Sequence, residues 1–151
     1  MSGSDTDLGG PRLPGLAFVG NARPDHAGGG SGLDLGKMVA FMSGQTRPVW
    51  DFEDIGDWWT RADAKAIAPI VAVPTTAGTG SETTGVVIFD LVSMHAKTGI
   101  AHRHLRPDLG IVDPENTRTL PPMVAACTGF DVLVHALESY TNLPYDRREA
   151  P

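Results

Sequence analysis

One apolar segment that runs straight into a series of hydroxyl side chains constrains the fold of this chain most. The segment IAPIVAVPTT (Ile67–Thr76) predicts a buried strand, and TTAGTGSETT (Thr75–Thr84) predicts a loop directly after it. Loops at the carboxyl ends of strands are where open α/β sheets bind nucleotides. Six hydroxyls of this loop can bond ribose and phosphate oxygens: Thr75, Thr76, Thr79, Ser81, Thr83 and Thr84. The alternative is a polar loop closed by its own Ser/Thr turns.

A second segment, GGGSGLDLGK (Gly28–Lys37), combines three glycines with the start of a predicted helix over 33–42. Ser31 is the expected N-cap of that helix. Glycines let the backbone approach a ligand closely, and the free N–H groups of a helix N-terminus attract an anion. The segment matches neither the GxGxxG motif nor a Walker A loop, so a flexible glycine-rich turn is the alternative.

A third segment, GFDVLVHALESY (Gly129–Tyr140), predicts a mostly apolar, buried helix that runs from about Met123 to Tyr140. Residues four apart share a helix face, so one stripe carries an acid, an imidazole and a thiol: Cys127, Asp131, His135 and Glu138. A carboxylate and an imidazole at this spacing can share a divalent metal ion. Catalytic metal sites usually take three or more protein ligands, however, and this helix offers two. A hydrogen-bonded Asp–His pair or a solvated polar face therefore remains the alternative, and Cys127 is expected to be packed in the helix.

The remaining segments predict an α/β fold. Further short strands are expected at Leu16–Gly20, Gly85–Asp90, Lys97–His102 and Leu109–Asp113. Residues 43–66 predict a loop that holds a single helical turn, and Asp113–Pro122 predicts a turn-rich link. His102 and His104 are expected at the surface.

Composition excludes several classes of function. The chain has 151 residues, enough for one ordinary domain, and a formal net charge of −6. This charge argues against a nucleic-acid or anionic-membrane partner. A single cysteine, Cys127, excludes an intrachain disulfide framework and a cysteine-based zinc site. No segment reaches the length of a membrane span, and residues 1–10 resemble neither a signal nor a transit peptide, so a cytoplasmic location is expected.

In this order, GGGSGLD, PTTAGTGSE, DPENTRTLPP and GFDVLVHALESY resemble the iron-containing (group III) alcohol dehydrogenase family. The longer run VPTTAGTGSETTGVVIFD, with KTGIA and LGIVDP, is most similar to the hydroxyacid-oxoacid transhydrogenase branch. The resemblance implies a partial Rossmann-like nucleotide-binding domain over residues 1–118, with 1–26 poorly defined. It also implies that residues 119–151 begin an all-helical metal-binding domain.

The same resemblance implies the site residues. The family's pyrophosphate turn corresponds to Gly29, Gly30 and Ser31, with Asp34 and Lys37 at matching motif positions. Its cofactor loop corresponds to Thr75, Thr76, Thr79 and Ser81, and a further cofactor contact corresponds to Lys97. The first two metal ligands correspond to Asp131 and His135. The implied cofactors are NAD or NADP and Fe²⁺ or Zn²⁺, and the implied substrate is a small alcohol, hydroxy acid or oxo acid. The parent enzyme is expected to be a homo-oligomer.

Two departures from the family pattern affect the expected activity. The family supplies two more histidine ligands well beyond the position of Tyr140, and only residues 1–27 precede the glycine turn here. The chain is therefore expected to be an inactive fragment of a longer metal-dependent oxidoreductase. Two alternatives stay open: a non-catalytic nucleotide-binding or oligomerisation module, and another branch of the family, such as a glycerol dehydrogenase-like or maleylacetate reductase-like enzyme.

Overall fold

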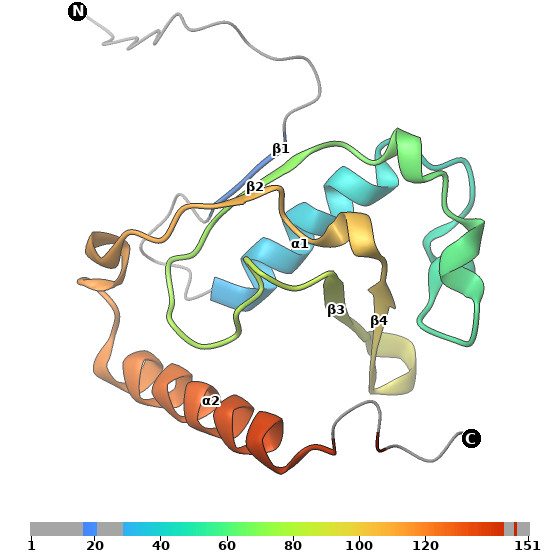
Figure 1. Ribbon diagram of the computed structural model, residues 1–151. Coiled ribbons are helices and arrows are strands. Elements are labelled where there is room, and N and C mark those ends of the chain that lie inside the picture. The colour runs from blue at the N-terminus through green and yellow to red at the C-terminus, as the bar shows by residue number, and fades with distance from the viewer. Residues whose placement is uncertain (1–16, 21–28, 144–146, 148–151) are drawn as a thin grey trace, which may run out of the picture.

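The computed structural model describes residues 17–20, 29–143 and 147 (Figure 1). Its strands and long helices are, in chain order, β1 (Ala17–Gly20), α1 (Gly29–Met42), β2 (Ile70–Val73), β3 (Val86–Leu91), β4 (Ala96–Ala101), β5 (Leu109–Gly110) and α2 (Pro122–Thr141). Short 3₁₀ turns lie between them at Val49–Phe52, Trp58–Arg61, Ala64–Ala66, Val92–Met94, Arg103–Leu105 and Pro114–Thr117.

A parallel sheet with the order β1-β2-β5 confirms the predicted α/β class. β2 lies in the middle of this sheet, and its first three residues are buried. The strand begins at Ile70 and not at Ile67, because Pro69 has no N–H group to donate to a neighbouring strand. The hydroxyl-rich loop follows directly from the carboxyl end of β2, as predicted.

Helix α1 packs against this sheet through a small apolar cluster. Leu33 and Ala40 on the helix contact Ile70 and Ala72 on β2. The helix starts at Gly29, four residues before the predicted start. Ser31 therefore lies inside the first turn, and its predicted role as N-cap is wrong.

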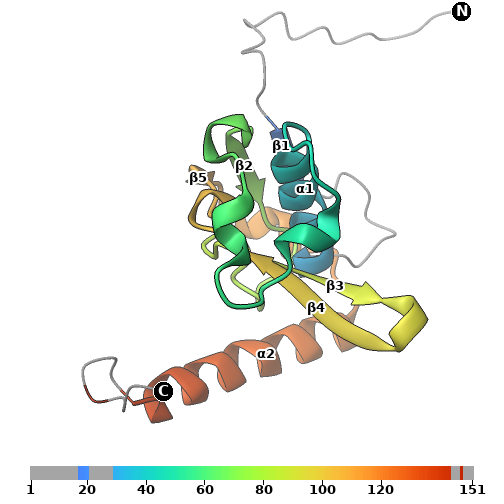
Figure 2. The same cartoon turned by 90° about the vertical axis from the view of Figure 1, so that its right-hand side faces the viewer.

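β3 and β4 form a separate antiparallel hairpin that closes a second cluster (Figure 2). This cluster is built around Phe41 from α1, Phe52 from the first 3₁₀ turn, Val87 from β3, Ile100 from β4 and Leu105. α1 therefore lies between the parallel sheet and the hairpin and contributes to both clusters. Residues 43–66 hold three 3₁₀ turns, not the single turn that was predicted.

His102 is 7% exposed, so its predicted surface location is wrong. Its ring contacts Phe41 and Trp59, with centroid separations of 5.8 and 6.3 Å. Its Nδ1 accepts a hydrogen bond from the backbone N–H of His104, which satisfies one ring nitrogen inside the fold. His104 is exposed, as expected.

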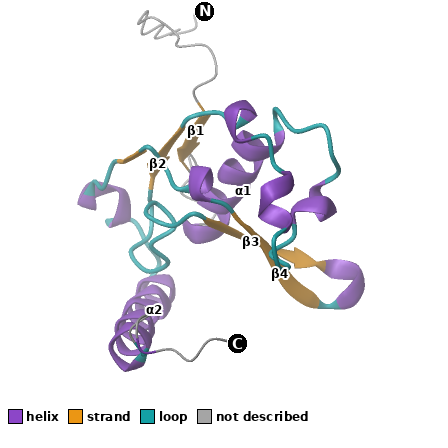
Figure 3. Ribbon diagram, turned by 45° about the vertical axis from the view of Figure 1, so that its right-hand side comes forward, coloured by secondary structure: helices purple, strands orange, loops and turns teal. Residues whose placement is uncertain are grey.

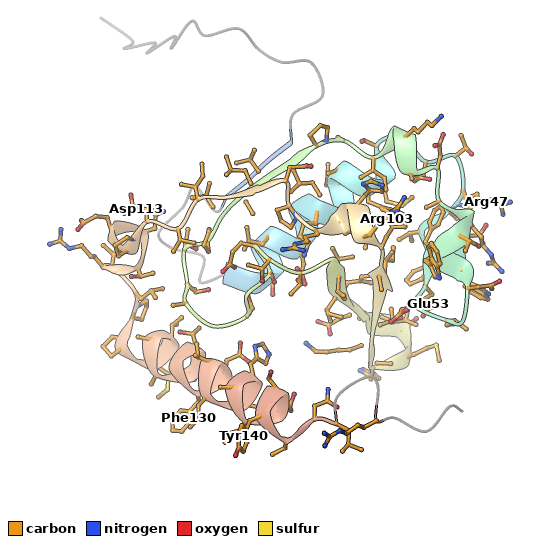
Figure 4. All side chains as sticks on the ribbon, in the orientation of Figure 1. Arg47, Glu53, Arg103, Asp113, Phe130 and Tyr140 are labelled. Carbon is orange, nitrogen blue, oxygen red and sulfur yellow. The ribbon has the colours of Figure 1, made fainter. Side chains whose placement is uncertain are left out.

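Helix α2 lies apart from the other elements along one side of the molecule (Figures 1 and 2). It begins and ends within one residue of the predicted limits, but none of its residues is buried in the described structure. The predictions of a buried helix and of a packed Cys127 are therefore wrong for this structure. The labelled side chains of Phe130 and Tyr140 point away from the remainder of the chain (Figure 4). The predicted division into two domains near residue 118 stays a prediction.

Candidate functional site

One cavity of about 380 Å³ collects most of the residues that the sequence singled out. We call it the shared cavity, and its walls come from the start of α1, the hydroxyl-rich loop, the hairpin and α2. Its lining residues are Gly30, Ser31, Asp34, Thr79, Ser81, Thr84, Val86, Ile88, Lys97, Asp131 and His135. The volume lies in the range of small-molecule sites.

Two glycine–threonine contacts hold the hydroxyl-rich loop against the start of α1. A Cβ atom on Gly29 would lie 1.5 Å from Oγ1 of Thr76, and one on Gly30 would lie 2.5 Å from Cγ2 of Thr79. Real Cβ atoms do not approach other heavy atoms so closely. These glycines are therefore required by the packing of the loop itself.

A third glycine brings the same loop to α2, which the loop approaches from above in Figure 3. A Cβ atom on Gly78 would lie 2.9 Å from the carbonyl oxygen of Thr128 and 3.2 Å from Oδ2 of Asp131. The loop therefore lies against the cofactor-binding candidates Gly29 and Gly30 on α1 and against the metal-ligand candidate Asp131 on α2.

Several hydroxyls of the loop are used inside the loop. Thr79 Oγ1 accepts a hydrogen bond from the N–H of Ser81 at 3.3 Å, and Thr83 Oγ1 donates to the carbonyl of Gly80 at 2.8 Å. Gly80 has a φ of +64°, which favours glycine at this turn. The alternative of a loop closed by Ser/Thr turns therefore describes part of this segment correctly.

Lys37 lies beneath the loop and does not line the shared cavity. Its side chain is 0% exposed, and Nζ donates to the carbonyl oxygens of Ser81, Thr84 and Val86 at 3.0, 2.8 and 2.6 Å. Thr84 Oγ1 is a fourth acceptor at 3.2 Å. Burial lowers the pKa of Lys37, and the neighbouring Asp34 carboxylate opposes this shift. The ammonium has three N–H groups and these acceptors occupy them, so its geometry does not support the predicted cofactor contact.

Asp34 connects α1 to the hairpin. Its Oδ2 accepts a hydrogen bond from the N–H of Ile88 at 3.0 Å, and its Oδ1 lies 3.7 Å from Nζ of Lys37. Oδ1 is buried and makes no hydrogen bond in the described part of the chain. The Asp34 carboxylate therefore joins the backbone of β3 to the buried ammonium of Lys37.

Asp131 and His135 lie on successive turns of α2, with 3.7 Å between Oδ1 and Nε2. Metal–ligand bonds of about 2.1 Å to each atom span at most about 4.2 Å, so one divalent ion can contact both. Within residues 29–143 and at 147, no third His, Cys, Asp or Glu side chain completes a metal-binding group with them. The pair therefore fits part of a metal site.

The remaining predicted residues lie outside the shared cavity or at its edge. Thr75 and Thr76 are partly buried and do not line it. Gly29 does not line it either, because it is packed against Thr76. Lys97 lines the cavity from β4, with its side chain 77% exposed and Nζ 3.8 Å from Asp90. Sequence reasoning did not select Val86 and Ile88. The period of two along β3 is the signal that could have placed them on one face.

Comparison with known proteins identifies the family of the chain. The family model "Iron-containing alcohol dehydrogenase" matches residues 26–114. The chain belongs to the iron-containing alcohol dehydrogenase family. The resemblance predicted from the motifs is confirmed.

Among curated relatives, hydroxyacid-oxoacid transhydrogenase of Xenopus laevis is 49% identical over 126 residues. The human enzyme of the same name is 47% identical over 126 residues. Each match covers 80% of this chain and 26% of the relative, so the chain spans about a quarter of these relatives' length. Both relatives are named as mitochondrial, which gives no support to the predicted cytoplasmic location.

Solved structures give the same fold. Sulfoacetaldehyde reductase of Bifidobacterium kashiwanohense in complex with NAD⁺ is 35% identical, with a TM-score of 0.67 over 83% of this chain and 30% of that one. NADH-dependent butanol dehydrogenase A of Thermotoga maritima is 27% identical, with a TM-score of 0.63, and the match covers 82% of this chain and 27% of that one.

Within the described residues, no helix is both long and apolar enough to cross a membrane.

Proposed function

We propose that this chain supplies the dinucleotide-binding part and two metal ligands of an oxidoreductase that acts on the CH–OH group of a small alcohol or hydroxy acid. The observation that carries the proposal is the shared cavity. It brings the start of α1, the hydroxyl-rich loop and the Asp131–His135 pair together at one place. Chemistry of the hydroxyacid–oxoacid transhydrogenase type fits best, because the curated relatives carry that name at 47–49% identity over 126 residues.

Different residues of the cavity would bind different parts of the dinucleotide. Backbone N–H groups at Gly30 and Ser31, at the positive end of α1, would bind the pyrophosphate of NAD. The exposed ammonium of Lys97 would orient the polar groups of the dinucleotide, and the Asp34 carboxylate would hold the cavity wall at Ile88. We favour NAD over NADP, because the reductase of Bifidobacterium kashiwanohense was solved with NAD⁺.

The Asp131 carboxylate and the His135 imidazole would hold a divalent metal such as Fe²⁺ or Zn²⁺ beside the cofactor. Such an ion acts as a Lewis acid on the substrate oxygen when it is bound. The loop at Gly78 lies against Asp131, and both ligands line the cavity with the cofactor residues, so that substrate and nicotinamide would share one space. A small-molecule substrate and a homo-oligomeric parent enzyme belong to this proposal.

A second candidate function is a dinucleotide-binding module without catalysis. It is favoured by one observation: in the described residues, the Asp131–His135 pair has no third metal-binding partner. Under this reading the chain binds NAD but has no turnover, and both readings predict dinucleotide binding.

Calorimetric titration of the 151-residue chain with NAD⁺ and NADP⁺ tests the proposal. We expect saturable binding of NAD⁺, weaker binding after Lys97→Gln, and unchanged binding after Lys65→Gln, which alters an exposed lysine outside the cavity. His135→Gln should leave NAD⁺ binding intact and weaken the binding of Zn²⁺. Absence of NAD⁺ binding by the folded chain would refute the proposal. Metal-dependent alcohol oxidation by this chain would reject the non-catalytic alternative.

A further inference from the structure

The residues that bind the Lys37 ammonium also line the shared cavity, on the side away from Lys37. The carbonyl oxygens that receive the Lys37 ammonium belong to Ser81, Thr84 and Val86. All three residues also line the cavity, whereas Lys37 does not. The segment 81–86 therefore turns its carbonyls toward a buried cation on one side and borders the binding space on the other.

An ammonium group suits this position because its three N–H bonds diverge from one point. Three carbonyls that converge on one atom force the chain to curl around it. Backbone carbonyls that face the interior without a donor would each lose a hydrogen bond, so the curl depends on the cation. Helix α1 supports Lys37 rigidly, since Leu33 and Ala40 on the same helix are packed against β2.

Asp34, one turn earlier on α1, fixes the next part of the same wall. Its Oδ2 accepts from the N–H of Ile88, and Ile88 also lines the cavity. Lys37 and Asp34 together hold four lining residues across the end of the loop and the start of β3. These four residues are 44 to 54 positions away from them in sequence.

We propose that Lys37 is a positioning residue that, with Asp34, sets the shape of the cofactor-binding wall without touching the cofactor. The part of this inference that concerns the cofactor rests on the proposed function. It replaces a direct contact with NAD by an indirect role, because the ammonium is fully buried and its N–H groups are occupied.

Hydrogen exchange of backbone amides tests the positioning role on the full 151-residue chain. Lys37→Met keeps an unbranched side chain and removes the three donors. We expect exchange to become about tenfold faster or more in residues 81–88, while β2 and the part of α1 around Phe41 keep their protection. The matched control is Lys65→Met, at an exposed lysine on a 3₁₀ turn, and it should change neither region.

The same proteins are then titrated with NAD⁺. We expect Lys37→Met to weaken binding by about tenfold or more, and saturating NAD⁺ to restore part of the lost protection in residues 81–88. Faster exchange throughout the molecule would show that Lys37 is a general stability residue, which overturns the inference. Unchanged exchange and unchanged affinity in the folded variant would overturn it as well, with the proposed function intact.

If the wild-type chain binds no NAD⁺, the proposed function fails, and the exchange pattern alone still decides whether Lys37 holds the wall. If Lys37→Met does not fold, labelling of the wild-type chain with an amine-acetylating reagent decides the point. Lys65 and, without NAD⁺, Lys97 should be acetylated quickly. Lys37 should be acetylated only on unfolding, whether or not NAD⁺ is present. Acetylation of Lys37 as fast as Lys65 in the native chain would place its ammonium at the surface and overturn the inference.

Discussion

Replacement of Gly29 by alanine should destabilise the chain, although alanine is normally the better helix former. The new Cβ would lie 1.5, 2.6 and 2.7 Å from Oγ1, Cβ and Cγ2 of Thr76. Carbon atoms in contact prefer separations of about 3.5–4.0 Å, so the loop and the helix must move apart by about 1 Å. Rotation of the Thr76 side chain cannot relieve this, because its own Cβ is one of the three atoms.

The size of the effect follows from two opposing terms. Overpacking of this kind costs about 1–3 kcal/mol, and alanine in place of glycine in a helix returns up to about 1 kcal/mol. Alanine adds less helix stability at the first position of α1 than at an interior position. We therefore expect the unfolding free energy to fall by about 1–2 kcal/mol. With a urea dependence of about 1–3 kcal/mol per M, the unfolding midpoint should fall by about 0.3–2 M.

Urea unfolding followed by circular dichroism measures this midpoint, and two further variants make the test specific. Thr76→Gly in the Gly29→Ala background removes all three clashing atoms, so the double variant should be more stable than the two single losses predict. Gly129→Ala is the control, because a Cβ there meets nothing within 4 Å, and it should leave stability unchanged or raise it. A Gly29→Ala chain as stable as wild type, or strict additivity with Thr76→Gly, would refute the reasoning.

Two other predictions concern the second apolar cluster. Phe41→Ala should lower the unfolding free energy, measured in urea, by about 3–5 kcal/mol, because this fully buried ring packs edge-on against Phe52. The control Leu35→Ala, on the exposed face of α1, should lower it by under about 1 kcal/mol. Burial, followed by the neighbouring His104 and Arg103, lowers the pKa of His102 below its ordinary value of 6.5. The unfolded chain therefore binds more protons just below pH 6.5, and stability should fall as the pH drops from 6.5 toward the folded pKa. Urea midpoints between pH 7.5 and 5.5 should lose this slope in His102→Asn, and an unchanged slope would contradict the assignment.

The sequence predicted the elements of this fold well because their patterns are local. The apolar run of β2, the period of α2 and the turn residues after each strand depend on near neighbours. The motifs also identified most residues of the shared cavity, because a family motif gives the spacing between site residues and composition does not.

Several features that the sequence did not show depend on contacts between distant segments. Nothing in the motif of Lys37 shows that three carbonyls of residues 81–86 surround its ammonium. His102 was placed at the surface because the aromatic rings that cover it come from α1 and a 3₁₀ turn. Gly29 and Gly30 were expected to make room for a ligand, and the structure shows that they first make room for threonines of the loop.

The arrangement of the parallel sheet has a consequence for how the chain reaches its native state. Each neighbour of β2 is remote in sequence, with Ala17 beside Ile70 and Val71 beside Leu109, whereas β3 and β4 are joined by a short turn. Local hairpins form within microseconds, while pairings between remote segments form late. β1 is synthesised before the apolar strand IVAV and β5 after it, so the edge of IVAV that pairs with β5 would stay open until β5 emerges. During this interval the open edge of the strand can pair with another chain, which is a route to aggregation.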